Sequence, residues 1–143
     1  MSHPILSASF REKAEQHIEW FEKQTSCEIR LHIEMQNNAE LMDRAAFVFD
    51  HLGMKKTKLR NAILIYIQIT PSKLALLGVS GLHFVSQETW ETWTAQLSLS
   101  FKECSFESGI RQVLEMIVQE VKGNFPYQLD DINELSNQIS QSK

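Results

Sequence analysis

The chain has 143 residues, 43% of them hydrophobic and 22% charged, with a formal net charge of −4 at pH 7. This length fits one domain spanning residues 1–143, and the composition is typical of a globular protein rather than a disordered one. The negative net charge argues against a nucleic-acid binder, which needs a basic surface. The cysteines, Cys27 and Cys104, are too few for a disulfide framework and favour a reducing compartment.

Neither targeting nor membrane segments are evident. The residues from Met1 to Ser7 lack the basic and apolar stretches of a signal peptide. The longest apolar run, Ala62–Ile69, is much shorter than the roughly 20 residues of a membrane helix. We therefore expect a cytoplasmic protein with no membrane insertion.

The first two predicted elements are a helix and a strand. Apolar side chains recur at helical spacing over Phe10–Lys23, and Ser9 with Glu12 has the form of a capping box. Apolar and polar residues then alternate strictly over Cys27–Met35. This alternation predicts a strand with one covered face and one wetter face, near an edge of the sheet.

A second helix and a buried strand follow. Asn37 with Glu40 resembles another capping box, and Gly53 stands where a helix is expected to end in a left-handed cap. The run Ala62–Ile67 is apolar on both faces and rich in β-branched residues, which predicts a central strand.

The third strand, Leu74–Leu77, comes so soon after the second that the two must form an antiparallel hairpin. The connection between the first and second strands is long enough for a parallel crossover. A mixed sheet with helices on both faces is therefore expected. Further helices are predicted around Trp90–Phe101 and Ile110–Val121, before a polar tail over residues 127–143. We expect eight large side chains to be buried: Phe21, Leu31, Phe49, Ile65, Trp90, Phe101, Ile110 and Ile117.

Four motifs, in chain order, carry a resemblance to a known family. They are Thr25–Arg30, Arg60–Tyr66, Leu77–Leu82 and the ending from Phe125 to Leu135. The first three resemble the T-x-G-E-I, R-N-G-V-L-I-Y and G-D-x-G-I elements of TPM domains, and the last resembles the ending of the stand-alone bacterial members. The family includes relatives of the thylakoid lumen acid phosphatase and of photosystem II repair proteins. The resemblance implies an α/β fold, a three-layer α/β/α sandwich around a four-stranded sheet.

The resemblance also bears on chemistry, because phosphatase activity and divalent-cation binding have been attributed to some relatives. Cys27 and Ala62 stand where the family usually has glycine, and Val79 stands where it usually has aspartate. We therefore expect a cation affinity weaker than in relatives that keep this aspartate, or none.

The predicted topology brings several polar segments to one edge of the sheet. Glu28 and Asn61 open the two parallel strands, and the antiparallel third strand ends at Gly78 and Gly81. We call this region, formed by Glu28, Asn61 and Gly78 to Gly81, the loop edge. Leu82 replaces the second glycine of the G-x-S-x-G nucleophile elbow, so the glycines are better explained by a tight turn with positive φ.

The tail supplies the candidate metal ligands. If the last helix returns to the loop edge, the tail offers oxygen ligands that suit Ca²⁺ or Mg²⁺; the residues are Asp130, Asp131, Asn133 and Glu134. The alternative interpretation is a solvated acidic segment that caps a final turn.

A basic loop borders the same edge. Its residues Lys55, Lys56 and Arg60 are candidates for binding an anion, and a solvated basic loop is the alternative interpretation. The leading hypothesis is a stand-alone regulatory or protein-binding module of unassigned activity, with a divalent cation and an unknown protein partner. The alternative is a metal-assisted phosphatase, in which the cation beside the basic loop polarises a phosphoryl oxygen.

Overall fold

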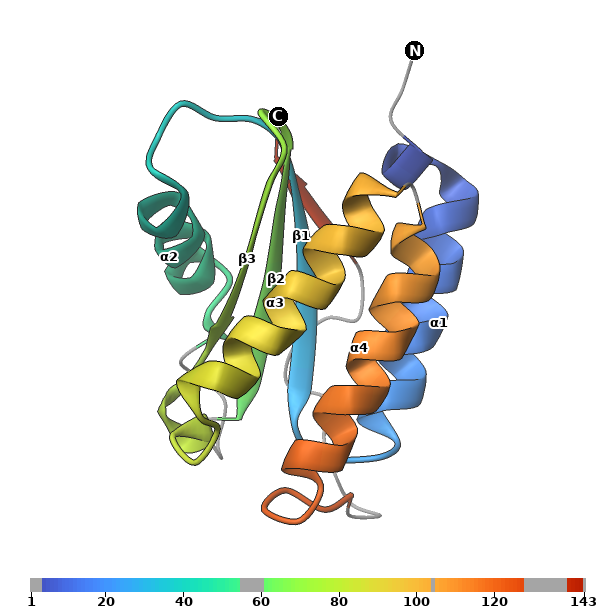
Figure 1. Cartoon of the computed structure of the whole chain (residues 1–143), viewed down its shortest axis with the longest axis vertical. Helices are drawn as coiled ribbons and strands as arrows, with labels where there is room; N and C mark the ends of the chain where they lie inside the picture. Colours follow the sequence, from blue (N-terminus) through green and yellow to red (C-terminus); the bar gives the residue numbers. More distant parts are fainter. Residues whose placement is uncertain (1–3, 55–60, 104, 128–138, 143) are drawn as a thin grey trace.

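The computed structural model describes residues 4–54, 61–103, 105–127 and 139–142. It is a three-layer α/β/α sandwich with the strand order β3-β2-β1-β4 (Figure 1). The strands are β1 (Glu28–Gln36), β2 (Ala62–Thr70), β3 (Lys73–Gly78) and β4 (Ser140–Ser142). The helices are α1 (Ala8–Glu22), α2 (Leu41–His51), α3 (Gln87–Lys102) and α4 (Phe106–Val121), with short 3-10 helices η1 (Pro4–Leu6) and η3 (Ser80–Leu82). No helix in the described ranges is long and apolar enough to cross a membrane.

The expected mixed sheet is confirmed. β1 pairs in parallel with β2, from Glu28 opposite Ala62 to Gln36 opposite Thr70. β2 pairs antiparallel with β3, and Ile65 lies opposite Leu76 in the middle of this pair. The lengths of the two connections were sufficient to predict both directions.

The strand β4 was implied by the family resemblance but not identified in the sequence. It pairs in parallel with β1, where Ser140 lies opposite His32. Two side chains of α1 bind the backbone just before this strand. Arg11 Nη1 donates to the Ile139 carbonyl at 2.9 Å, and the Ile139 N–H donates to Glu15 Oε2 at 3.2 Å. Contacts with a distant helix therefore position this short polar strand.

The expectation of a wetter face on β1 was wrong, although the strand does lie next to the edge strand β4. β1 lies between β2 and β4, and its polar residues Glu28, His32 and Glu34 are buried. Apolar and polar side chains of β1 do alternate between the two faces of the sheet. The polar ones point toward the face that α2 partly covers, where they are buried with polar neighbours. Polar side chains on a strand thus did not mark a solvent-exposed face.

The two faces of the sheet have separate cores. On one face, α1, α3 and α4 cover alternate residues of β1 and β2, which are all aliphatic: Ile29, Leu31, Ile33, Ile63, Ile65 and Ile67. On the other face, α2 packs Ala45, Val48 and Phe49 against Leu64 and Tyr66 of β2. Every residue expected in the core is buried except Trp90, which is partly buried.

The caps of two helices differ from the predicted ones. Ser7, rather than Ser9, begins α1, because its Oγ accepts from the Phe10 N–H at 3.0 Å. Glu40, rather than Asn37, begins α2, because its carboxylate accepts from the Asp43 N–H at 2.8 Å. The left-handed residue predicted after α2 is confirmed, since Gly53 has φ of 71°.

Candidate functional site

The loop edge is the edge at which β1 and β2 begin and β3 ends (Figure 1). The Glu28 N–H donates to the Asn61 carbonyl at 3.0 Å, and the Val79 N–H donates to the Ala62 carbonyl at 3.1 Å. Gly78 is the last residue of β3, and Gly81 lies just beyond it in η3. The structure thus brings these four predicted residues, Glu28, Asn61, Gly78 and Gly81, to one end of the sheet.

The chain that leaves α4 also arrives at the loop edge. The Ser26 N–H donates to the Phe125 carbonyl at 3.0 Å, and the Thr25 hydroxyl donates to the same oxygen. Thr25 and Pro126 form an antiparallel bridge. The segment that precedes the acidic tail therefore starts at this edge of the sheet.

Side chains at the loop edge bind the backbone of neighbouring strands. Asn61 Nδ2 donates to the Ser26 carbonyl at 2.7 Å, and Cys27 Sγ donates to the Asn61 carbonyl at 2.7 Å. Burial, followed by the nearby charge of Glu28, raises the pKa of the Cys27 thiol. A protonated, buried thiol is a poor nucleophile, so Cys27 serves to join two strand ends.

The glycine of β3 is explained by close packing rather than by a tight turn. Among the glycines in the described ranges, Gly53 alone has positive φ, so the expected positive φ at Gly78 and Gly81 was wrong. A Cβ atom on Gly78 would lie 2.6 Å from the Trp90 ring, which is closer than van der Waals contact allows. Gly78 therefore lets the indole of α3 pack against the strand.

The remaining predicted site residues lie outside the described ranges. These are the tail residues Asp130, Asp131, Asn133 and Glu134 and the basic residues Lys55, Lys56 and Arg60. Within the described part of the chain, no three His, Cys, Asp or Glu side chains are grouped to hold a metal ion. The Ser26 Oγ at the loop edge is buried without a hydrogen-bond partner among the described residues.

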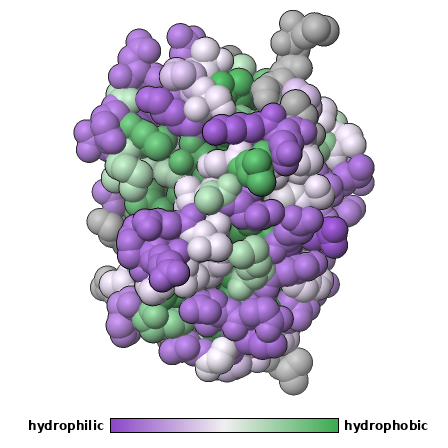
Figure 2. Space-filling model, in the orientation of Figure 1, coloured by the Kyte–Doolittle hydropathy of each residue, from purple (hydrophilic) through white to green (hydrophobic). Residues whose placement is uncertain are grey.

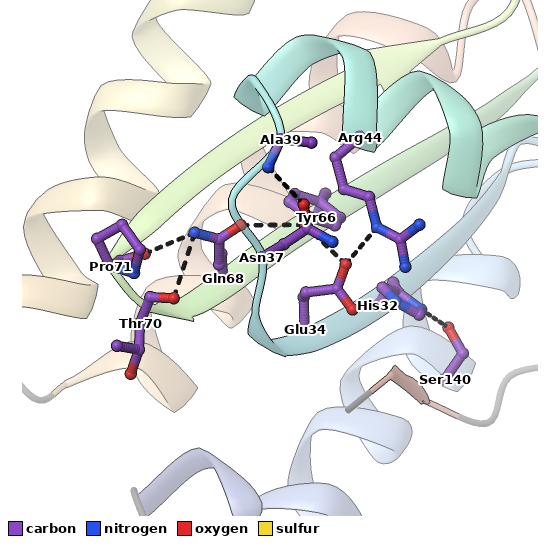
Figure 3. Close-up of polar contacts among 10 residues, drawn as sticks. All are labelled: His32, Glu34, Asn37, Ala39, Arg44, Tyr66, Gln68, Thr70, Pro71 and Ser140. Atoms are coloured by element: carbon purple, nitrogen blue, oxygen red, sulfur yellow. Dashed lines mark hydrogen bonds and ion pairs between the residues drawn. The ribbon is translucent and has the colours of Figure 1, made fainter.

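A second group of polar residues lies between the sheet and α2 (Figure 3). We call Glu34, Arg44, Tyr66 and Gln68 the polar cluster. Arg44 Nε of α2 donates to Glu34 Oε1, and the Tyr66 hydroxyl donates to the same oxygen at 3.2 Å. Gln68 Nε2 donates to the Pro71 carbonyl at 3.1 Å, which links the cluster to the β2–β3 turn. The cluster therefore fixes α2 against β1 and β2 and contacts the turn between β2 and β3.

The electrostatics of this cluster keep the ion pair charged. Burial raises the pKa of the Glu34 carboxyl, but hydrogen bonds from Arg44 and Tyr66 outweigh it and leave this pKa below its usual value. The hydrogen bond to Glu34 raises the pKa of Arg44. Burial raises the pKa of the Tyr66 phenol. At neutral pH the cluster therefore contains a buried carboxylate paired with a guanidinium, and a protonated tyrosine donates to the carboxylate.

His32 lies beside the polar cluster, with its ring stacked 6.0 Å from that of Tyr66. Its Nδ1 is 2.7 Å from the Ser140 Oγ of β4 (Figure 3). Burial lowers the pKa of His32 to about 4, so the imidazole is neutral at physiological pH. Glu34 and Gln68 lie opposite each other in the β1–β2 pair. A polar residue in each of two buried strands was the sequence signal that could have identified this region.

A groove follows the outer side of β3, between α2 and α3. It has a volume of about 780 Å³. We call it the β3 groove, and its main lining residues are Met42, Leu74, Leu76, Trp90, Glu91 and Thr94. Figure 2 shows apolar surface, in green, between α2 and α3.

The β3 groove meets the loop edge. Gly78, Val79 and Ser80 line it where β3 ends, so the two regions share these residues. Sequence reasoning missed the groove because its apolar residues resemble core residues. Trp90, which was expected in the core, packs edge to face on Trp93 at 5.1 Å and also lines the groove.

Comparisons with known proteins agree with this architecture. The sequence profile of the TPM domain matches residues 2–120. The NMR structure of the BA42 protein from the psychrophilic bacterium Bizionia argentinensis is similar to the chain, with 34% identity and a TM-score of 0.87, over 95% of this chain and 94% of that one. The N-terminal domain of a P. gingivalis protein shares the fold, with 13% identity and a TM-score of 0.68, over 88% and 82% of the two chains. No curated protein matches significantly. The chain belongs to the TPM domain family.

Proposed function

We propose that this TPM domain is a protein-binding module and that the β3 groove is its binding site. The observation that carries the proposal is an open groove of about 780 Å³ with a largely apolar lining at the edge of the sheet. This volume and lining are typical of sites that accept the side chains of a ligand. Met42 at its rim is 46% exposed, an apolar surface that a partner would cover.

The chemistry of the loop edge supports binding rather than thiol catalysis. Asn61 and Thr25 are engaged with backbone groups, and the Cys27 thiol is buried and protonated. These side chains hold the strand ends in place, and a fixed end of the sheet gives the adjoining groove a defined shape. We therefore favour a regulatory module over an enzyme with a cysteine nucleophile.

A divalent cation at the loop edge is a second part of the proposal. It rests on the oxygen-bearing residues Asp130, Asp131, Asn133 and Glu134, and on the Thr25–Pro126 bridge that brings the preceding segment to this edge. A cation that binds only the folded state should raise the melting temperature when millimolar Ca²⁺ or Mg²⁺ is added, and a chelator should reverse the shift. An ion-pair clamp with Lys55, Lys56 and Arg60 should instead weaken with salt and not respond to chelator. A melting temperature that neither cation changes would refute the proposed cation site.

The alternative function is a metal-assisted phosphatase at the same edge, where a cation would polarise a phosphoryl oxygen. Hydrolysis of a generic aryl phosphate, measured with and without Mg²⁺, separates it from the binding module. Turnover that Asp131→Asn abolishes would favour the phosphatase. Turnover at background level in both proteins would favour the binding module.

The binding function is tested with peptides selected from a displayed library of random linear 12-mers. Met42→Lys places a charge in the apolar groove and should weaken a selected peptide about tenfold or more. Leu99→Lys is the matched control, because Leu99 is 52% exposed on α3 and lies outside the groove lining. Selected peptides that bind both variants equally well, or a library that yields no binder, would refute the proposed site.

A further inference from the structure

The backbone of β3 presents hydrogen-bonding groups to the groove. The Val79 N–H bonds to the Ala62 carbonyl of β2, and Gly78 lies opposite Ile63 in the same ladder. In an antiparallel pair, residues bond to the partner strand alternately. Ala75 and Leu77 therefore point their N–H and C=O groups toward β2, as Val79 does. The alternate residues Leu74, Leu76 and Gly78 point theirs away from β2, toward the open side.

This open side lacks the usual protection of an edge strand. β3 is the last strand in the order β3-β2-β1-β4, and no strand among the described residues pairs with its outer side. Proteins commonly block such edges with charged residues, prolines or bulges. Leu74–Leu77 contains neither a charge nor a proline, and Lys73 stands only at the start of the strand. The edge is therefore chemically competent to pair with another strand.

We infer that the partner is an extended peptide segment that adds to β3 as a further strand of the sheet. This inference rests on the proposed function of the β3 groove and specifies its ligand. A strand as long as β3 spans about 20 Å, and its backbone would bond to Leu74, Leu76 and Gly78. Its alternate side chains would point toward the two walls, against Met42 of α2 and Trp90 of α3.

The shape of the groove favours a single segment over a second copy of this chain. Both α2 and α3 line the groove beside β3, so the edge lies between two helices (Figure 1). A second copy would bring its own α2 and α3 against these walls, whereas one extended segment needs no such space. Glu91 lines the groove next to Trp90, which favours a lysine or arginine in the partner segment at that end.

Amide hydrogen exchange of the unmodified protein, followed by NMR with a library-selected 12-mer, tests the inference. Exchange at Leu74, Leu76 and Gly78 should be fast in the free protein. At a peptide concentration about 100 times its Kd, this exchange should slow by about 100-fold, because the amides are accessible only when the peptide is released. Ala75 and Leu77, already bonded to β2, should show little change and serve as internal controls. Methylating every second peptide nitrogen should abolish the protection when the methylated nitrogens face β3. It should leave the protection intact when they face away from β3.

The possible outcomes distinguish a failure of strand addition from a failure of the proposed binding function. Peptides that lose affinity in Met42→Lys but leave the three outward amides unprotected would refute strand addition and retain the groove as a binding site. Peptides that bind elsewhere would refute both. Protection without peptide that rises with protein concentration, together with a doubled mass in sedimentation, would identify a second copy as the occupant and overturn the inference.

Discussion

The two faces of the sheet are built by different chemistry. The face under α1, α3 and α4 is lined by aliphatic side chains from β1 and β2, and three helices exclude water from it. The other face is covered by α2 and contains the polar cluster, in which Arg44 is paired with the fully buried Glu34. Apolar packing is non-directional, whereas hydrogen bonds fix angles and distances. We infer that the first face supplies most of the stability and that the second determines where α2 sits.

The position of α2 matters because α2 forms one wall of the β3 groove. Met42, which lines the groove, and Arg44, which is anchored to Glu34, lie two residues apart on this helix. The face that contributes less apolar burial is therefore the face that shapes the proposed binding site. Substitutions on the two faces should accordingly separate stability from binding.

The largest effect on stability is expected on the apolar face. Ile65 is 2% exposed in the central strand β2. Ile65→Ala should lower the free energy of unfolding by about 2–5 kcal/mol, because it removes buried methyl groups and leaves a cavity. Urea denaturation followed by circular dichroism measures this loss. Leu99→Ala on the exposed side of α3 is the control and should change stability by less than about 0.5 kcal/mol. A loss that small at Ile65 would show that β2 is not the centre of the core.

The next effect concerns the ion pair on the polar face. Arg44→Met should cost about 3 kcal/mol at pH 7, because it leaves the Glu34 carboxylate buried without its cation. Adding Glu34→Gln to this variant should recover part of the loss, and the double-mutant cycle measures the coupling. The deficit should shrink below pH 5, since burial then favours protonation of the unpaired Glu34. Additive losses that do not vary with pH would show that the two residues are not coupled.

A third effect is a pH dependence from His32. Its pKa is lowered from 6.5 to about 4 in the folded state, so between these values the unfolded chain binds a proton that the folded chain excludes. Stability should therefore be fully present above pH 6.5 and decline as the pH falls toward 4. His32→Gln should flatten this slope between pH 6.5 and 4.5, as measured by urea denaturation at several pH values. A slope unchanged in the variant would assign the decline to other groups.

The sequence could predict the elements that depend on local patterns and connection lengths, but not those that depend on contacts with distant residues. The directions of β1, β2 and β3 follow from connection lengths, and the position of the loop edge follows from those directions. The strand β4 has the polar sequence Ser-Gln-Ser, without apolar alternation, and it is positioned by Arg11 and Glu15, which are more than a hundred residues away. No local pattern in the tail could identify such a strand.

The candidate site was only partly predictable for a related reason. Glu28 and Asn61 were placed correctly at the loop edge because they open parallel strands, but the polar cluster was missed. Glu34 was interpreted as facing water, and only the tertiary structure supplies Arg44 as its partner. The β3 groove was missed because it depends on the gap between α2 and α3, which helical periodicity does not encode.

The most direct test compares peptide binding by two variants of matched stability, one from each face. Ile65→Val should cost about 0.5–1.5 kcal/mol on the apolar face, and Arg44→Lys is the milder change on the polar face because it loses the fixed geometry of the guanidinium. Urea can be added to the more stable variant until both have the same free energy of unfolding. At that point, Arg44→Lys should bind the selected 12-mer several-fold more weakly than Ile65→Val, since only the former displaces a wall of the groove. Equal affinities would contradict the claim that the polar face positions α2 for binding.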